Sequence, residues 1–264
     1  MILFFNTKRL RVFIFEFLTL FLLISCLQGP VNGGGMPKYG GTYRVPLASE
    51  PTSLDPAYIT DIYSVNVAMN IFDGLVEFDR ELNVVPAIAR VWKISRDHLT
   101  YTFFLRRGVR FHNGREVTAR DFIFSISRIL SPDTRSPVAS FFLNIKGARA
   151  YNNGRAFSIS GLRAPDPYTL KIELEHPFTP FLSILAMANA KVVPVEALGP
   201  SFGRHPVGTG PYRFKSWEPG EKIILMANEN YFGGRPFLDS LYFKILSGFP
   251  VFQDLPEYRM GEDL

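Results

Sequence analysis

The 264-residue sequence predicts a mixed α/β protein, and three observations lead to this fold class. Short β-rich runs alternate with segments whose apolar residues recur at helical spacing. A composition of 47% hydrophobic and 20% charged residues is typical of a globular protein with a packed core. The single cysteine excludes an intrachain disulfide framework, a cysteine-rich zinc site and an iron–sulfur cluster held by this chain alone.

Apolar spacing and capping residues predict three helices. Apolar residues recur at helical intervals over residues 61–72, which predicts an amphipathic helix there. Thr118 marks the start of a second helix, whose apolar residues share one face. Thr179 as N-cap, with Pro180 at the first helical position, opens a third helix that ends near Met187.

Runs of β-forming residues bounded by turn residues predict the strands. Asn113-Gly114 and Asp166-Pro167 are two of the turn signals. The strands are expected at Thr42–Leu47, Thr100–Leu105, Ile159–Leu162, Thr169–Leu174, Tyr212–Phe214, Lys222–Met226 and Leu241–Ile245.

The first 25 residues are predicted to be a signal peptide. Lys8, Arg9 and Arg11 precede an apolar run over residues 12–24, which is the order of charge and apolar residues found in export signals. Glu16 interrupts this run, and the run is shorter than the ~20 apolar residues that a membrane-spanning helix needs. A permanent transmembrane anchor is therefore the weaker interpretation.

The end of the apolar run predicts a lipid anchor. Leu23-Ile24-Ser25-Cys26 resembles the lipobox of bacterial lipoproteins, in which the cysteine thiol receives a diacylglyceryl group and the chain is cut before it. The alternative is an ordinary signal peptide with a chance cysteine. Residues 26–39, with three consecutive glycines, are expected to form a flexible tether between lipid and fold.

Charge and motifs argue against nucleic-acid binding and against catalysis. Removal of three basic residues and one acidic residue with the signal peptide lowers the formal charge from +5 to +3, and no basic cluster interleaved with aromatic residues occurs. The sequence holds no nucleophile elbow, phosphate-binding loop, dinucleotide fingerprint or H-E-x-x-H. The motifs therefore give no support for a cofactor or a metal site, and neither is expected.

Several sequence blocks resemble one transport family. The blocks are Pro86–Trp92, Tyr101–Arg106, Phe111–Gly114, Val117–Phe122, Gly208–Tyr212 and Asn228–Pro236. Their order and spacing are similar to those of family 5 extracellular solute-binding proteins, the oligopeptide-, dipeptide- and nickel-binding components of ABC importers. His98 stands where that family usually has glycine, at an expected turn. Most of the matched residues are predicted to serve the scaffold rather than a ligand.

The resemblance implies a particular architecture. Members of this family have two lobes that enclose the ligand, and they are roughly twice as long as this chain. We therefore expect the first lobe of a periplasmic-binding-protein type II fold, truncated before the second lobe. Its core subdomain is expected at residues 40–75 and 177–264, and an inserted subdomain at residues 76–176.

The resemblance also implies ligand contacts, at Thr60, Asp61, Ile62, Tyr63, Val138 and Met187. In relatives the segment that corresponds to residues 60–63 runs beside a bound peptide, where extended main chain exchanges strand-like hydrogen bonds. Asp61 is alternatively a helix cap, and both roles are compatible. Val138 falls where a peptide-binding relative offers a tyrosine. Met187 is near a pocket-lining position, but a core role is the stronger interpretation.

The function implied is solute capture for an ABC importer. Members of the family bind solutes without making or breaking bonds, so the resemblance implies that the chain has no catalytic residues. The partners would be a peptide or another small solute, the permease with its ATPase subunits, and the membrane through a lipid anchor, on the periplasmic or extracellular side. The ligand could be a di- or oligopeptide, a nickel chelate, a sugar or an opine. With half of the enclosing surface absent, we expect weak peptide binding or none. The alternatives are a sensory or non-functional half-length fragment, and a lipid-anchored hydrolase.

Overall fold

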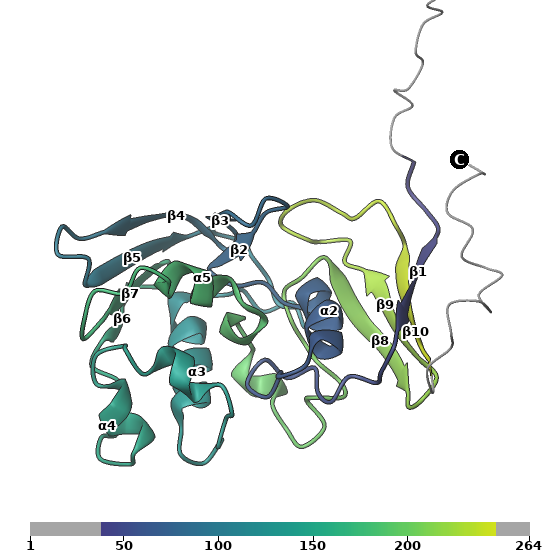
Figure 1. Ribbon diagram of the computed structural model, residues 1–264. Helices are drawn as coiled ribbons and strands as arrows, with labels where there is room; N and C mark the ends of the chain where they lie inside the picture. The colour runs from purple at the N-terminus through teal and green to yellow at the C-terminus, as the bar shows by residue number, and fades with distance from the viewer. Residues whose placement is uncertain (1–37, 247–264) are drawn as a thin grey trace, which may run out of the picture. The chain divides into compact units, whose positions relative to one another are not determined.

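The computed structural model describes residues 38–246, and one of its sheets joins distant parts of that range. This sheet has the strand order β1-β10-β9-β8, in which β1 runs parallel to β10 and the other pairs are antiparallel (Figure 1). Its strands are β1 (Thr42–Leu47), β8 (Tyr212–Glu218), β9 (Lys222–Ala227) and β10 (Ser240–Ile245). The amino-terminal strand of the described chain is therefore held by a strand about 200 residues later.

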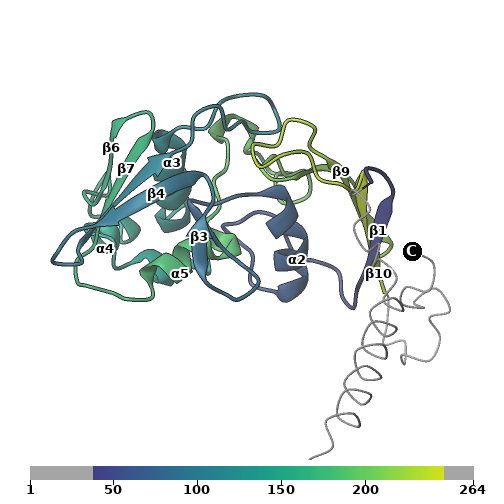
Figure 2. The ribbon, with the colours of Figure 1, turned by 90° about the horizontal axis from the view of Figure 1, so that it is seen from above.

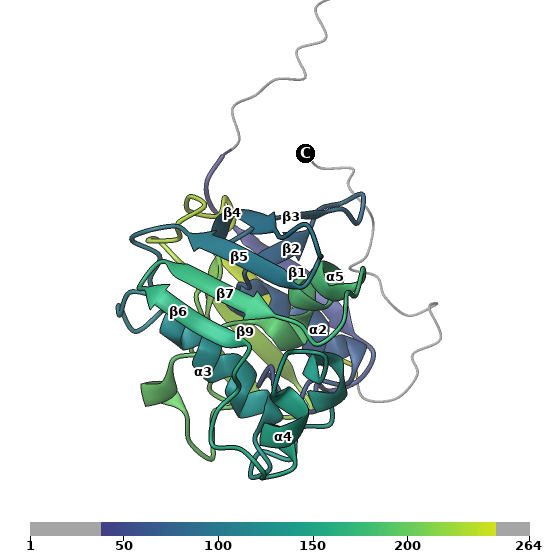
Figure 3. The same cartoon turned by 90° about the vertical axis from the view of Figure 1, so that its left-hand side faces the viewer.

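A second sheet is antiparallel throughout and has the order β4-β5-β7-β6 (Figure 3). Its strands are β4 (Ala89–Ile94), β5 (Thr100–Leu105), β6 (Leu162–Asp166) and β7 (Thr169–Glu173). A short ribbon of β2 (Val76–Phe78) and β3 (Val84–Pro86) precedes it. The two four-stranded sheets draw their strands from different sides of the expected subdomain boundaries, and the boundaries themselves stay a prediction.

Four α-helices and three 3₁₀ helices accompany the sheets in the described range. The α-helices are α2 (Ile62–Ile71), α3 (Ala119–Leu130), α4 (Ala148–Asn152) and α5 (Phe181–Ala186). The 3₁₀ helices are η1 (Ala139–Phe142), η2 (Ala188–Ala190) and η3 (Val195–Ala197). Helix α2 contacts β8, α3 contacts β6 and β7, and α5 packs against β2 and β3. Figure 2 shows α5 beside β3. No helix in residues 38–246 has the length and apolarity to cross a membrane.

The buried residues follow the periodicity of each element. Along β5 the side chains of Tyr101, Phe103 and Leu105 are buried, while the residues between them are half-buried. Helix α3 adds an apolar stripe to the same hydrophobic cluster, as its helical spacing predicts. A second cluster forms between α2 and the β1-β10-β9-β8 sheet. The mixed α/β prediction is confirmed.

Some element boundaries differ from the sequence-based expectation. The strand expected at Ile159–Leu162 lies instead at Leu162–Asp166, because Ile159 is buried in the core and Gly161 is held by backbone bonds to Lys146 and Glu173. The N-cap of α5 is Pro180, not Thr179, so that helix begins one residue later. Strands β2, β3 and β4 and the helix α4 were not expected, since they are short or interrupted.

His98 lies in the turn between β4 and β5. Its φ is 58°, which is in the left-handed region that favours glycine. This conformation explains why glycine suits the position. The His98 N–H donates to the carbonyl of Ser95 (2.9 Å), and Asp97 accepts from Leu99 N–H (3.1 Å), which closes the turn.

The Gly208-Thr209-Gly210 block packs directly onto the end of α2. A Cβ atom on Gly208 would lie 2.0 Å from the carbonyl oxygen of Ile71, and one on Gly210 would lie 2.6 Å from that of Asn70. Gly210 N–H donates to the Ile71 carbonyl at 2.8 Å. The block therefore needs glycine because its backbone touches the helix backbone.

The loop that carries Phe111–Gly114 is attached to the same place through His112. The backbone N–H of His112 donates to the Gly208 carbonyl (2.7 Å), and Gly208 N–H donates to Nδ1 of the ring (3.3 Å). Nε2–H is then free to donate to the Gly210 carbonyl (3.0 Å). Both ring contacts are satisfied by a neutral imidazole, because a second ring proton would face the Gly208 N–H.

Buried charge at the end of α2 is held by hydrogen bonds. Asp73 accepts from Thr209 Oγ1 (2.8 Å) and from Tyr231 Oη (3.1 Å), and Asn228 Nδ2 donates to the Gly210 carbonyl (3.0 Å). Burial raises the pKa of Asp73, and burial lowers the pKa of Lys191, the nearby buried cation. Three of the sequence blocks thus converge on α2 as scaffold.

His112 predicts a specific acid sensitivity. Burial, supplemented by Arg213, lowers the pKa of His112 to about 4, although its hydrogen bond to Gly210 acts in the opposite direction. Between pH 6.5 and 4 the unfolded chain binds a proton at this ring and the folded chain does not, so stability falls as the pH falls. We expect a loss of about 3 kcal/mol over this window, and His112→Gln should flatten it. Urea unfolding at pH 7, 5.5 and 4 measures the slope.

The matched control for this measurement is His205→Gln, which changes an exposed histidine and should leave the slope unchanged. An H112Q variant with the wild-type pH dependence would contradict the assignment.

Candidate functional site

Four of the six expected contact residues lie where the chain enters α2: Thr60 and Asp61 end the preceding turn, and Ile62 and Tyr63 begin the helix. Asp61 is the N-cap of α2. Its Oδ1 accepts from Ser64 N–H (2.7 Å), and its Oδ2 accepts from Ser64 Oγ (2.7 Å) and Thr52 Oγ1 (2.6 Å). Burial acts to raise the pKa of this carboxyl, but the hydrogen bonds outweigh it and the pKa lies below its ordinary value. The capping role is confirmed.

An ion pair anchors the start of this turn to α3. Arg128 grips the carboxylate of Asp55 with both terminal nitrogens, at 2.7 Å and 2.5 Å, and the side chains are 17% and 5% exposed. Asp55 Oδ1 also accepts from Ala57 N–H (3.0 Å). Burial acts to lower the pKa of Arg128, but the pair with Asp55 raises it overall. A planar, two-bonded pair of this kind fixes the turn in one orientation.

The loop before Val138 is fastened to the same turn. Ser136 Oγ donates to the Ala57 carbonyl (2.6 Å), and Tyr58 Oη donates to the Thr134 carbonyl (2.8 Å). Val138 itself is 5% exposed and packs in the hydrophobic cluster of the β4-β5-β7-β6 sheet. Its side chain therefore presents no surface to a ligand in this structure, and the loop serves the turn through Ser136.

The segment after Met187 supplies the third attachment. Asn189 is 5% exposed, and its Nδ2 donates to the carbonyls of Pro56 and Ile59, both at 2.9 Å. Met187 is half-buried at the C-cap of α5. The sequence analysis missed Asn189 and Ser136 because a buried amide or hydroxyl that binds a distant carbonyl leaves no local pattern.

These attachments leave part of the turn open. Thr60 and Ile62 are exposed, Ile62 by 59%, whereas Asp61 and Tyr63 are half-buried. The structure thus brings together the segment of residues 55–63, the loop before Val138 and the segment after Met187. Within residues 60–63, Thr60 and Ile62 form the exposed part. The chemistry on offer is hydrogen bonding and apolar contact. Residues 38–246 contain no group of three or more His, Cys, Asp or Glu side chains that could hold a metal.

Comparison with known protein families decides what this fold belongs to. The model of the bacterial extracellular solute-binding proteins, family 5 (middle part), matches residues 83–248, which is more than half of the chain. The chain belongs to this family. The resemblance seen in the sequence blocks is confirmed.

The similar proteins are longer than this family 5 chain. The oligopeptide-binding protein AppA of Bacillus subtilis (strain 168) is 32% identical over 216 residues, which are 81% of this chain and 39% of AppA. The periplasmic murein peptide-binding protein MppA of Escherichia coli (strain K12) is 34% identical over 194 residues, 70% of this chain and 36% of MppA. The chain thus spans about two fifths of the length of these relatives.

Solved structures agree with the sequence comparison. The structure of AppA from Bacillus subtilis in complex with a nonapeptide matches this family 5 chain with a TM-score of 0.70 and 29% identity. The match covers 80% of this chain and 41% of that one. The mixed α/β architecture described above is therefore that of family 5 proteins.

The Asp55–Arg128 pair generates a prediction about the turn. Asp55→Asn keeps an acceptor for Ala57 but leaves the largely buried Arg128 without a counter-charge, so we expect a loss of about 3 kcal/mol of unfolding free energy. The double variant Asp55→Asn/Arg128→Met should recover part of that loss, because it removes both charges. Urea denaturation of the two variants measures the effect.

Asp133→Asn, which alters an exposed aspartate, is the control and should be neutral. Strictly additive effects of the two changes, with no recovery in the double variant, would show that the pair does not act as a unit.

Proposed function

We propose that this chain captures peptides or similar small solutes on the outer side of the inner membrane for delivery to an ABC permease and its ATPase subunits. Membership of family 5 is the observation that carries the proposal. Two relatives are named for binding an oligopeptide and a murein peptide, and one structure holds a nonapeptide. The chain acts by binding alone and needs no catalytic residue or cofactor.

The ligand-contact surface in this proposal is residues 60–63, in which Thr60 and Asp61 end the turn and Ile62 and Tyr63 are the first, helical residues of α2. Its backbone runs into α2 from an N-cap residue with extended φ and ψ angles. Extended main chain can hydrogen-bond a peptide backbone, which fixes the direction of the peptide without selecting its side chains. Ile62 adds an exposed apolar surface at the first position of α2. Val138 and Met187 lie two residues from Ser136 and Asn189, whose side chains hold the turn. In this proposal the two segments support the ligand-contact surface through these neighbours.

Rigidity of this turn supports a role in binding. Bonds to Arg128, Ser136 and Asn189 hold residues 55–59 from three different segments of the chain. A surface that is already ordered loses little conformational entropy when a ligand binds, so more of the contact energy appears as affinity. A ligand that contacts this surface more strongly in a closed than in an open arrangement would favour the closed one.

Lipid attachment is the second part of the proposal. Cys26 and the signal peptide lie outside the described residues, so this part rests on the sequence. Acyl chains on Cys26 would hold the domain at the membrane, where the permease is located, and several chains hold far more firmly than one. The tether of residues 26–39 would give the domain room to reach its partner.

Ile62→Asp tests the ligand-contact surface. Ile62 is the first residue of α2, where a carboxylate suits the helix dipole, so the fold should be unaffected. Loss of its apolar contact and the introduced charge should weaken peptide binding at least tenfold. Isothermal titration calorimetry of the full chain with a mixture of short peptides measures this change.

Leu82→Asp, which alters another exposed aliphatic residue, is the control and should bind like the wild type. Peptide binding that is unchanged in I62D would remove residues 60–63 from the site. Because the chain spans about two fifths of its relatives, we expect the wild-type affinity to be weak, and no heat even at millimolar peptide would contradict peptide capture by this chain.

Cys26→Ser tests the anchor. The wild-type chain, expressed in a bacterium with lipoprotein-processing enzymes, should incorporate labelled fatty acid and partition into detergent. The variant lacks the thiol that receives the lipid, so it should do neither. Ser25→Ala, which retains a small residue before the cysteine, is the matched control. Label incorporated equally by C26S and the wild type would overturn the anchor.

A further inference from the structure

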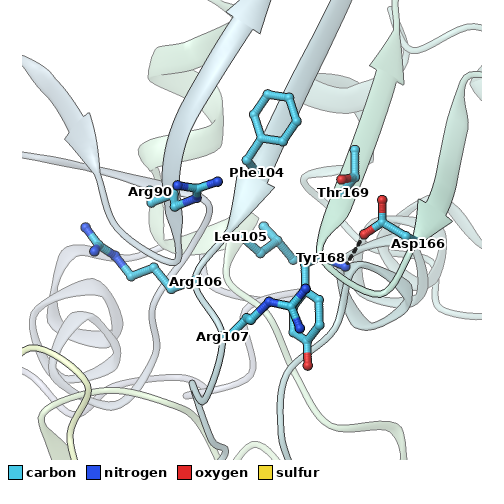
Figure 4. A pocket seen from close by; sticks show the side chains of 8 residues that line it. All are labelled: Arg90, Phe104, Leu105, Arg106, Arg107, Asp166, Tyr168 and Thr169. Atoms are coloured by element: carbon cyan, nitrogen blue, oxygen red, sulfur yellow. Dashed lines mark hydrogen bonds between the residues drawn. The ribbon is translucent and has the colours of Figure 1, made fainter.

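A pocket of about 600 Å³ lies on the β4-β5-β7-β6 sheet and is lined by none of the residues of the turn before α2. Three arginines dominate it: Arg90 from β4, and Arg106 and Arg107, which follow β5 (Figure 4). Phe104 and Thr169 form its floor on neighbouring strands, where they are register partners. A volume of this size is typical of sites for small ligands.

Two β-bulges shape this pocket. On β4 the register with β5 passes from Ala89 directly to Val91, so Arg90 is an extra residue without a partner on β5. On β6 the register with β7 shifts between Arg163 and Asp166. Bulges redirect side chains and are frequent beside functional sites. Here they flank the Phe104–Thr169 pair on both sides.

The three guanidinium groups are held in place, and Arg107 is attracted to the nearby carboxylates of Asp166 and Glu116 without a close ion pair to either. Arg106 Nε donates to the Ala87 carbonyl (2.9 Å), and the Arg107 guanidinium lies 4.3 Å from the centre of the Tyr168 ring. Arg90 is exposed in the bulge. None of the three takes part in an ion pair between residues 38 and 246. The hollow thus carries three positive charges against the one carboxylate in its lining, Asp166, and a bound anion would reduce the remaining repulsion between the arginines.

The nearby carboxylates of Asp166 and Glu116 hold the turns beside the pocket and offset part of the charge of Arg107. Asp166 accepts from the backbone N–H of Tyr168 at 2.8 Å, as Figure 4 shows. Glu116 accepts from Gly108 N–H (2.7 Å) and from Tyr168 Oη (3.1 Å). These bonds close turns and hold the tyrosine under Arg107, so the acids serve the walls of the pocket.

The adjoining sheet surface is also basic. Lys93, Thr102, Lys171 and Arg163 form one row across the sheet, beside the row that contains Phe104 and Thr169. Lys93 Nζ lies 5.8 Å from the centre of the Phe104 ring, which places this cation on the pocket side. A surface lined by one sign of charge attracts ions of the other sign and raises their local concentration.

We propose that this arginine pocket, composed of Arg90, Arg106, Arg107 and Thr169, binds a phosphate-class anion. Guanidinium groups match phosphate oxygens in paired hydrogen bonds, whereas the Thr169 side chain in the lining is hydrogen-bonded to Asp166. The same chemistry occurs in free inorganic phosphate and in the phosphodiester of an anionic lipid headgroup. The site is independent of the proposed peptide surface and holds whether or not the chain binds peptides.

Calorimetry of the full chain with inorganic phosphate, at constant ionic strength, tests the site. Sedimentation with vesicles of phosphatidylglycerol, compared with phosphatidylcholine vesicles, tests the lipid source. Arg90→Gln and Arg107→Gln should each weaken binding at least tenfold in whichever of the two experiments, phosphate calorimetry or vesicle sedimentation, detects binding by the wild type. Arg106 is left intact because it also supports the Ala87 backbone. Arg155→Gln makes the same charge change at an exposed arginine outside the pocket and should alter affinity less than twofold.

Phosphate binding that R90Q and R107Q weaken selectively supports the site with a free anion as ligand. Vesicle binding that depends on phosphatidylglycerol and is weakened selectively supports the site with a headgroup as ligand. Binding in neither arm overturns the proposal, and so does equal weakening by R155Q, which would indicate unspecific attraction. Thermal unfolding of each variant near the wild-type midpoint shows that a loss of binding is not a loss of fold.

Discussion

The contact between the Gly208–Gly210 backbone and the carboxyl end of α2 is the constraint on which the rest of the structure depends. A Cβ atom at either glycine would meet the carbonyls of Ile71 or Asn70 at distances that real side chains do not adopt. Because the loop comes this close, the Ile71 carbonyl gains a donor in Gly210, and Asp73 gains one in Thr209. Hydrogen bonds replace the water that these buried groups lose.

The same contact joins segments that are far apart in the chain. His112, from the loop between β5 and α3, hydrogen-bonds to Gly208 and Gly210. From the loop after β9, Asn228 donates to the Gly210 carbonyl and Tyr231 donates to Asp73. Helix α2 is thus held at its carboxyl end by the scaffold. At its amino end Asp61 caps it. Arg128, Ser136 and Asn189 hold the preceding turn through their bonds to residues 55–59. A helix fixed at both ends presents residues 60–63 in one arrangement, which is what a preorganised binding surface requires.

The two surfaces discussed above differ in character for physical reasons. The turn before α2 exposes main chain and one large aliphatic side chain, and its charged groups are satisfied internally. The pocket on the β4-β5-β7-β6 sheet is lined by three arginines that form no ion pair within residues 38–246. We therefore propose an uncharged or zwitterionic ligand for the first surface and an anion for the second. One scaffold can carry both because each is built on a different sheet region and neither shares a lining residue with the other.

Local signals in the sequence determined the elements whose patterns are short-range. The β-forming run Thr100–Leu105, the helical spacing of apolar residues over 61–72 and the capping residue Thr118 predicted β5, α2 and α3, and the order of sequence blocks indicated the family. Only the tertiary structure decided the rest. The bulge at Arg90, the burial of Val138 and the bonds from Asn189 and Ser136 depend on neighbours far away in the chain. Side-chain periodicity records which face of an element is buried, but it does not record which distant backbone that face will meet.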